Sequence, residues 1–159
     1  MIRHTVATLA YRAEKVLRDA PEGFADYRLS PGSRTPLEIV SHLGDLVEWA
    51  ERMAEGEYLW KPEPVSNWTH ACDRFFGGLL SLDAALGEST FEKFPAEVIF
   101  QGPIADAITH VGQLAMIRGA IGNPVRPESY ARAEIAIGRV GREQSVARKE
   151  FDGDASRRR

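Results

Sequence analysis

The chain has 159 residues, of which 43% are hydrophobic and 27% are charged, and its formal net charge is −3. This length and composition predict one soluble globular domain built around one core. The acidic balance argues against a general nucleic-acid binder, which needs a basic surface to neutralise phosphates.

The first predicted helix covers residues 3–19. Its apolar residues recur at helical spacing along one side: Val6, Leu9, Ala10, Ala13, Val16 and Leu17. A loop follows, because four residues typical of turns come close together: Pro21, Gly23, Pro31 and Gly32.

The second predicted helix spans residues 35–55 and begins at the sequence TPLE. Thr35 can cap it, Pro36 suits the first helical position, and Glu38 completes a capping box. Its apolar seam alternates steps of four and three residues: Ile39, Leu43, Leu46, Ala50 and Met53. His42 lies within this seam, so we expect its side chain to point with the apolar face.

A loop rich in proline and aromatic residues leads to the third predicted helix, residues 68–86, which Gly87 should end. Its seam repeats the same spacing: Trp68, Cys72, Phe75, Leu79, Leu82 and Leu86. Cys72 is the only cysteine, so no intramolecular disulfide can form. We expect it to be a small buried hydrophobe in a protein of the reducing cytoplasm.

The fourth predicted helix is PIADAITHVGQLAMIRGAIG, residues 103–122, which starts at a GP pair and ends at GNP. It is long enough to span a bilayer, but Asp106, His110 and Arg118 would then lie in hydrocarbon at high cost. We therefore expect no membrane span but a helix covered on most sides in a bundle. Small residues opposite the polar stripe should let another backbone approach: Ala105, Gly112 and Gly119.

Beyond Pro127 the periodicity is weak. The sequence EIAIGRV, residues 134–140, is compatible with a short extended strap. The four helices predict an all-α fold, a single four-helix bundle over residues 1–140. We expect residues 141–159 to form a weakly ordered tail.

A polar stripe runs up the fourth helix through Asp106, His110 and Gln113. Asp106 and His110 are one turn apart, the spacing at which two side chains can bind one metal ion. His42 on the second helix can supply a third ligand. Two histidines and one carboxylate leave coordination positions open, which is typical of catalytic rather than structural metal sites.

Each ligand also has an ordinary explanation. Asp106 near a helix start can interact with the helix dipole or form a simple ion pair. His42 and His110 can each be a hydrogen-bonded core histidine. The spacing of four between an aspartate and a histidine arises by chance in many helices. His4 and His70 lie off the seams, and we expect no site at either.

Two stretches, VSHLGDLVEWA and GPIADAITHVGQLAMIRGAIGNPVRPESY, resemble the DinB-like superfamily over residues 3–140. This superfamily of four-helix metalloproteins includes the bacillithiol and mycothiol S-transferases. The resemblance implies an up-down-down-up bundle with a metal triad of His42, Asp106 and His110. Asp106 departs from the pattern, because relatives carry His or Glu at that position. Val111 departs as well, because many relatives carry a basic residue there.

The resemblance implies a metal-dependent enzyme that holds Zn²⁺ or Ni²⁺. The metal would lower the pKa of a low-molecular-weight thiol, which would attack an electrophilic small molecule. A hydrolytic variant would activate water, and Gln113 would orient His110 in either case. The alternative is a non-catalytic metal- or ligand-binding bundle. Its seam of Ala105, Gly112 and Gly119 would then serve intrachain packing or a homodimer interface.

Overall fold

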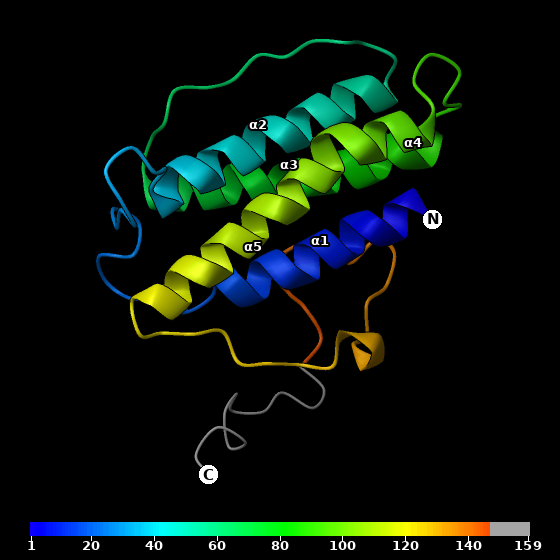
Figure 1. Ribbon diagram of the computed structural model, residues 1–159. Coiled ribbons are helices and arrows are strands. Elements are labelled where there is room, and N and C mark those ends of the chain that lie inside the picture. The colour runs from blue at the N-terminus through cyan, green and yellow to red at the C-terminus, as the bar shows by residue number, and fades with distance from the viewer. Residues whose placement is uncertain (147–159) are drawn as a thin grey trace.

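The computed structural model describes residues 1–146. Four helical rods lie side by side (Figure 1), and no strand occurs in the described part of the chain. The rods are α1 (Ile2–Leu17), α2 (Pro36–Ala54), α3 (Trp68–Glu88) and a fourth rod of three consecutive segments: α4 (Ala96–Ile99), a π-helical segment (Phe100–Ile104) and α5 (Ala105–Ala120). A 3-10 turn (Tyr130–Arg132) follows. The predicted all-α four-helix bundle is confirmed, whereas the up-down-down-up order stays a prediction.

The core forms where the predicted apolar seams meet. All the predicted seam residues of α1, α2 and α3 are buried except Trp68, which is partly buried and packs edge-on against Phe24. The fourth rod adds Ile99, Ile104 and Leu114, each at most 1% exposed. Burying each such side chain stabilises the fold by about 1.5–3 kcal/mol.

The ends of α2 follow the predicted signals. Thr35 Oγ1 accepts a hydrogen bond from the backbone N–H of Glu38 at 3.2 Å, and the Glu38 carboxylate accepts one from the Thr35 N–H at 2.6 Å. Gly56 follows the last turn with a φ of +88°, a conformation that other residues rarely adopt. This capping box fixes the start of the helix that carries His42. The end of α3 differs slightly, since the helix continues through Gly87 to Glu88.

The fourth rod begins at Ala96, earlier than the predicted start at Pro103. Proline cannot donate a backbone hydrogen bond, and it normally breaks a helix interior. Here the wider π-helical turn accommodates Pro103, and the Ala105 N–H bonds to the carbonyl of Phe100, five residues back. The expected helix start is therefore wrong: the rod passes through the proline and reaches Asp106 and His110 without a break.

The expectation that this helix is covered on most sides is also wrong. Gly112 and Gly119 are exposed, and a Cβ added at either would meet no described atom within 4 Å. Ala105 is only partly buried. Packing within the described residues therefore gives no reason for glycine at positions 112 and 119, and a homodimer through this face stays a prediction.

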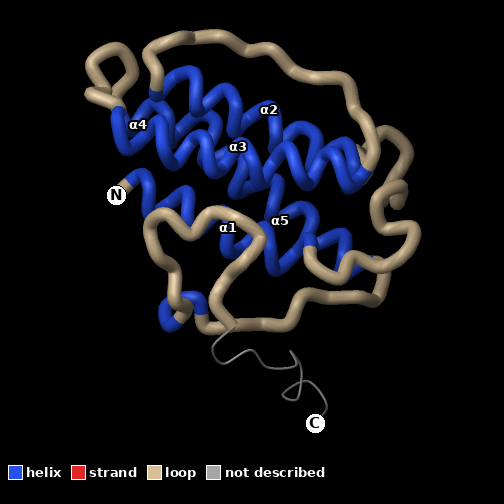
Figure 2. Tube along the Cα trace, turned by 180° about the vertical axis from the view of Figure 1, so that it is seen from behind, coloured by secondary structure: helices blue, strands red, loops and turns tan. Residues whose placement is uncertain are grey.

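An ion-pair network joins α2 to α3 and to the loop between these two helices. Arg74 of α3 reaches Asp45 at 2.8 Å and Glu48 at 2.7 Å, both on α2. Gly44 makes this approach possible, because a Cβ there would lie 3.0 Å from the Arg74 guanidinium. Asp45 also accepts a hydrogen bond from the backbone N–H of Glu63 at 3.0 Å, which holds the long loop against α2. That loop runs along the bundle in Figures 1 and 2.

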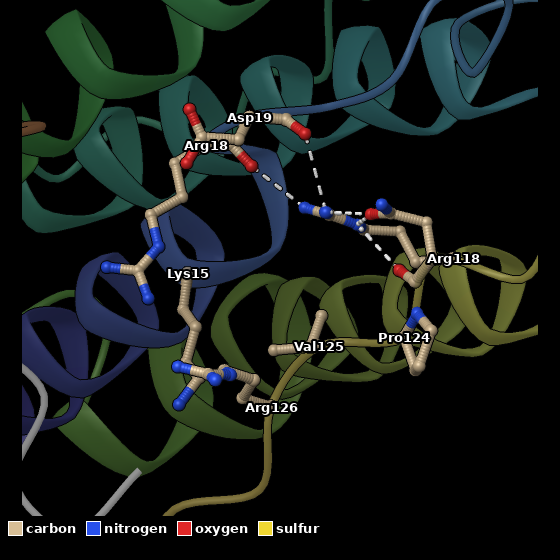
Figure 3. A pocket seen from close by; sticks show the side chains of 8 residues that line it. Lys15, Arg18, Asp19, Arg118, Pro124, Val125 and Arg126 are labelled. Carbon is tan, nitrogen blue, oxygen red and sulfur yellow. Dashed lines mark hydrogen bonds between the residues drawn. The ribbon is translucent and has the colours of Figure 1, made fainter. Parts of the chain in front are cut away.

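Arg118 joins the end of α1 to the end of α5 (Figure 3). Its guanidinium donates to the carbonyl oxygens of Arg18 at 2.8 Å and of Asp19 at 3.4 Å. It also donates to the carbonyl oxygen of Val16 at 2.8 Å. It also donates to the backbone and side-chain oxygens of Asn123. Arg118 therefore satisfies carbonyls at the C-terminal end of α1, where a helix lacks internal donors.

The segment after α5 packs back on α1. Glu128 accepts hydrogen bonds from Tyr11 at 2.5 Å and from the buried Lys15 at 2.9 Å.

Residues 134–140 form no strand, although Val140 is buried. Of the expected tail, residues 147–159 lie outside the described residues, and in the described part Arg142 pairs with Asp73 of α3. Within residues 1–146 no helix combines the length and the hydropathy that a membrane crossing needs.

Candidate metal centre

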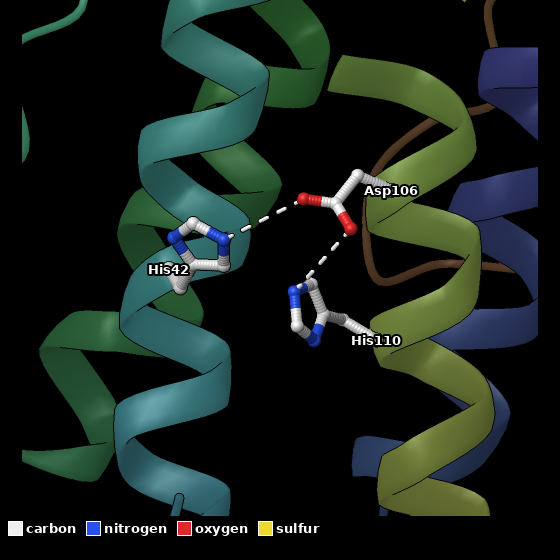
Figure 4. Close-up of side chains that lie close together, drawn as sticks. All are labelled: His42, Asp106 and His110. Atoms are coloured by element: carbon white, nitrogen blue, oxygen red, sulfur yellow. Dashed lines mark ion pairs between the residues drawn. The ribbon is translucent and has the colours of Figure 1, made fainter. Parts of the chain in front are cut away.

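His42, Asp106 and His110 converge between α2 and α5 (Figure 4). His42 projects from α2, and the other two lie one turn apart on α5. One nitrogen of each histidine and one carboxylate oxygen all lie within 4.8 Å of one another. The structure thus brings together the three side chains that the sequence singled out as metal ligands.

The distances within this triad suit a shared ion better than direct hydrogen bonds. His42 Nε2 lies 3.7 Å from Asp106 Oδ2, and His110 Nε2 lies 3.6 Å from Asp106 Oδ1. Both distances exceed the roughly 2.7–3.2 Å of an N–H···O hydrogen bond. Two ligand atoms about 2.0–2.1 Å from one tetrahedral ion lie about 3.3 Å apart. Small side-chain rotations would therefore bring these atoms to coordination distance, and the residues fit a divalent metal.

The two histidines are the ionisable neighbours of the Asp106 carboxylate. Among the described residues no lysine or arginine pairs with it, and its two ion pairs are those with the histidines. The rod also continues before it, so Asp106 does not lie at a free helix start. The helix-dipole explanation of Asp106 therefore loses support, whereas an ion pair with a protonated histidine stays the alternative to a shared metal ion. Its side chain is 49% exposed, which leaves one side of the triad open to solvent.

Gln113 sets the orientation of His110. His110 Nδ1 lies 2.8 Å from Gln113 Oε1, one turn further along α5. An amide oxygen only accepts hydrogen bonds, so Nδ1 is the donor, and in the neutral imidazole this tautomer leaves the lone pair on Nε2. That Nε2 is the atom facing Asp106. The contact is the one expected of a residue that orients a metal ligand.

His42 is held in its neutral form. Burial lowers the pKa of its imidazole, and the positive charge of Arg34, together with that of His110 when it is protonated, lowers it further. The carboxylates of Asp106 and Asp45 oppose this shift but do not outweigh it. A neutral imidazole can donate a lone pair to a metal ion.

Aromatic rings and a second carboxylate surround His42. The rings of His110 and Trp60 meet the His42 ring edge-on, with centroids 4.9 and 5.8 Å away. Asp45 Oδ2 lies 4.0 Å from His42 Nδ1, on the ring edge away from Asp106. Because Asp45 is also bonded to the loop backbone, it links the position of the loop to that of His42.

The sequence did not single out Asp45, and it indicated for Trp60 an anchor of the core or of a loop, with a place at a pocket mouth as the alternative. The spacing of three residues between His42 and Asp45 on one helix was the available signal for the carboxylate. Nothing in the sequence indicated that the loop bearing Trp60 folds back over α2. The contacts of Glu63 with Asp45 and Arg74, and of Trp60 with His42, show that it does.

The other histidines and the cysteine lie apart from the triad, as expected. His4 and His70 are exposed, and His70 Nδ1 pairs with Ser66 Oγ at 2.7 Å. Cys72 is buried, and this burial raises the pKa of its thiol to about 11. Such a thiol is protonated and unreactive at neutral pH.

Comparisons with protein-family models, curated proteins and solved structures find no match to this chain. The candidate centre therefore rests on the geometry of His42, Asp106 and His110. The DinB-like resemblance stays a prediction from the two sequence stretches that carry it.

Proposed function

We propose that this chain is a metal-dependent enzyme of the DinB-like type that acts on small molecules. The observation that best supports this proposal is the convergence of His42 Nε2, His110 Nε2 and the Asp106 carboxylate. The distances between these atoms are too long for hydrogen bonds and close to those between ligands of one metal ion. Two imidazoles and one carboxylate suit Zn²⁺ or Ni²⁺. A closed structural site would need a fourth protein ligand, and no other His, Cys, Asp or Glu of the described residues joins this cluster.

The favoured reaction is transfer of a low-molecular-weight thiol to an electrophilic small molecule. A divalent ion bound here supplies a Lewis acid that lowers the pKa of a thiol or of water. The thiol sulfur forms a bond to the electrophilic carbon, the leaving group departs with the electron pair of the broken bond, and the thiol proton passes to solvent. Hydrolysis, with water in place of the thiol, is the variant of the same site.

The chain's own residues have distinct parts in this proposal. Gln113 keeps the proton of His110 on Nδ1, so that Nε2 is free to bind. The exposed side of Asp106 leaves room for a thiol to approach. Trp60 packs against His42 and limits the water that reaches it. The buried Cys72 is not the thiol, so the thiol is a separate molecule, as expected in a reducing cytoplasm.

A non-catalytic, dimeric metal- or ligand-binding bundle is the second candidate. The exposed face at Gly112 and Gly119 favours it, because two backbones can approach closely there. The short side chain of Asp106 favours it as well, since aspartate reaches less far than the glutamate or histidine of relatives.

Metal analysis of the protein purified without added metal tests the metal centre on which the proposed enzyme depends. The proposal predicts close to one Zn²⁺ or Ni²⁺ per chain, and loss of that metal when His42 and His110 are both replaced by alanine. His4→Ala is the matched control and should keep the metal, because His4 is exposed and outside the triad. Metal-free wild-type protein, or a double variant that keeps its metal, would refute the site.

A thiol-conjugation assay then tests the enzyme. Metal-loaded protein should accelerate the reaction of a low-molecular-weight thiol with a chromogenic aryl halide, and the double variant should not. Stoichiometric metal without any acceleration, over a panel of thiols and electrophiles, would favour the non-catalytic candidate.

A further inference from the structure

A pocket of about 350 Å³ opens beside His110, on the face of the bundle between α5 and the loop that precedes α2. Its volume falls in the range of small-molecule sites, about 300–1,000 Å³. The loop, α2 and α5 all contribute to its lining: Leu29, Ser33, Arg34, Ile39, His110, Gln113, Met116 and Ile117. His110 therefore borders both this pocket and the candidate metal centre.

The walls of the pocket are mostly apolar. Ile39 and Ile117 are buried at its base, whereas Leu29 and Met116 remain 44% and 56% exposed at its edge. Apolar side chains left exposed around a hollow mark a surface that gains stability when an apolar group covers them. Methionine also adapts its shape to such a group.

Arg34 gives the pocket a positive charge. It is exposed and makes no hydrogen bond or ion pair with any other described residue. Within residues 1–146, no carboxylate lines the pocket.

Gln113 adds a neutral donor. Its Oε1 is taken by His110 Nδ1, so the amide N–H groups are the part of this lining side chain that can donate to a bound molecule. Ser33 contributes less, because its hydroxyl donates to the Ser30 carbonyl at 2.8 Å. The lining thus combines an apolar wall, one cation and one amide donor, which suits a molecule with an apolar body and an anionic end.

We propose that this pocket binds the electrophilic substrate, and that the substrate is a small carboxylic acid with an apolar or aromatic body. The carboxylate pairs with Arg34, and the body covers Leu29 and Met116. This assignment rests on the proposed function for its link to catalysis, but the binding preference itself needs no metal.

The test is a binding comparison on the full chain after its metal has been removed with a chelator. The probes are 3-phenylpropanoate and its neutral amide, 3-phenylpropanamide, followed by ligand-observed NMR. Wild-type protein should bind the acid about fivefold more tightly than the amide, as expected for one charged pair at a partly exposed position. Arg34→Gln should bind both probes equally and keep the amide affinity of the wild type.

Arg132→Gln is the matched control, since Arg132 is exposed and does not line the pocket. It should keep the preference of the wild type for the acid. Equal binding of acid and amide by the wild type, binding of neither probe, or a preference that survives Arg34→Gln would overturn the assignment. Because the binding comparison uses protein stripped of metal, its result does not depend on the metal. If metal analysis shows that the chain binds no metal and the Arg34-dependent preference is still present, the pocket assignment is retained and the metal enzyme is refuted.

Discussion

His110 and Gln113 form a hydrogen bond of 2.8 Å that leaves His110 Nε2 facing Asp106. The bond joins two residues one turn apart on α5, so it forms within the helix and does not depend on how the helices pack. Its consequence is a preset imidazole, oriented before any ion binds. Removing a hydrogen-bond partner of this kind commonly weakens metal binding by roughly 10–100-fold.

Gln113→Leu should therefore weaken metal binding by about 10–100-fold. Leucine keeps a similar volume but cannot accept the Nδ1 proton, so His110 is free to rotate and to change tautomer. Competition with a metal-binding dye measures the affinity. Gln113→Glu, which keeps an acceptor, is the control and should bind at least as tightly as the wild type. Equal affinities of the wild type and Gln113→Leu would show that the bond has no role at the metal.

The lowered pKa of His42 predicts that the stability of the metal-free protein depends on pH. Its folded pKa is lowered by burial and by neighbouring positive charge, so the unfolded chain takes up a proton first as the pH falls. This contribution to stability is complete above the ordinary pKa of 6.5, and it is lost as the pH falls from 6.5 through the lower folded value. Urea unfolding at a series of pH values measures the effect.

The matched variant for this series is His42→Asn, which cannot titrate in this range. Its stability should fall less steeply than that of the wild type below pH 6.5. Parallel curves for the two proteins would show that His42 is not held neutral in the folded state.

Cys72 should resist thiol reagents in the folded protein. Burial raises the pKa of its thiol to about 11, so less than about one thiol in a thousand is ionised at pH 7. A chromogenic disulfide reagent should label the native chain far more slowly than the urea-unfolded chain. If the native chain were labelled as fast as the unfolded chain, the thiol would be exposed and Cys72 would again be a candidate nucleophile.

Arg118→Lys should destabilise the fold by about 2–4 kcal/mol. A lysine ammonium cannot reproduce the planar set of donors that reaches the carbonyls of Val16, Arg18 and Asp19. Urea unfolding measures the change. Arg52→Lys is the control, because Arg52 makes a surface ion pair with Glu57 at 3.6 Å and should cost less than about 0.5 kcal/mol. Similar losses of stability in both variants would show that the Arg118 hydrogen bonds do not stabilise the contact between α1 and α5.

The helices and the triad could be predicted because their signals are local. The seams of α1, α2 and α3 follow from periodicity, and the capping box at Thr35 follows from four consecutive residues. His42 was placed correctly because it lies among buried residues of a strongly amphipathic helix. Asp106 and His110 followed from the spacing of one helical turn.

The features that sequence reasoning missed depend on contacts between distant segments. Pro103 normally breaks a helix, and its place inside one depends on the π-helical turn around it. Trp60 and Arg34 lie in loops, whose paths no periodicity describes. The exposure of Gly112 could not be predicted either, because small residues suit a close contact and an open surface equally well.

The most direct test of the account is a crystal of the protein soaked with Zn²⁺, with data collected on both sides of the zinc absorption edge. A metal ion held by the triad should give one strong anomalous peak about 2.0–2.2 Å from His42 Nε2, His110 Nε2 and an Asp106 oxygen. The same soak of Asp106→Ala should give a weaker peak or none. Absence of a peak among these three side chains in the wild type, or a peak held by other residues, would contradict it.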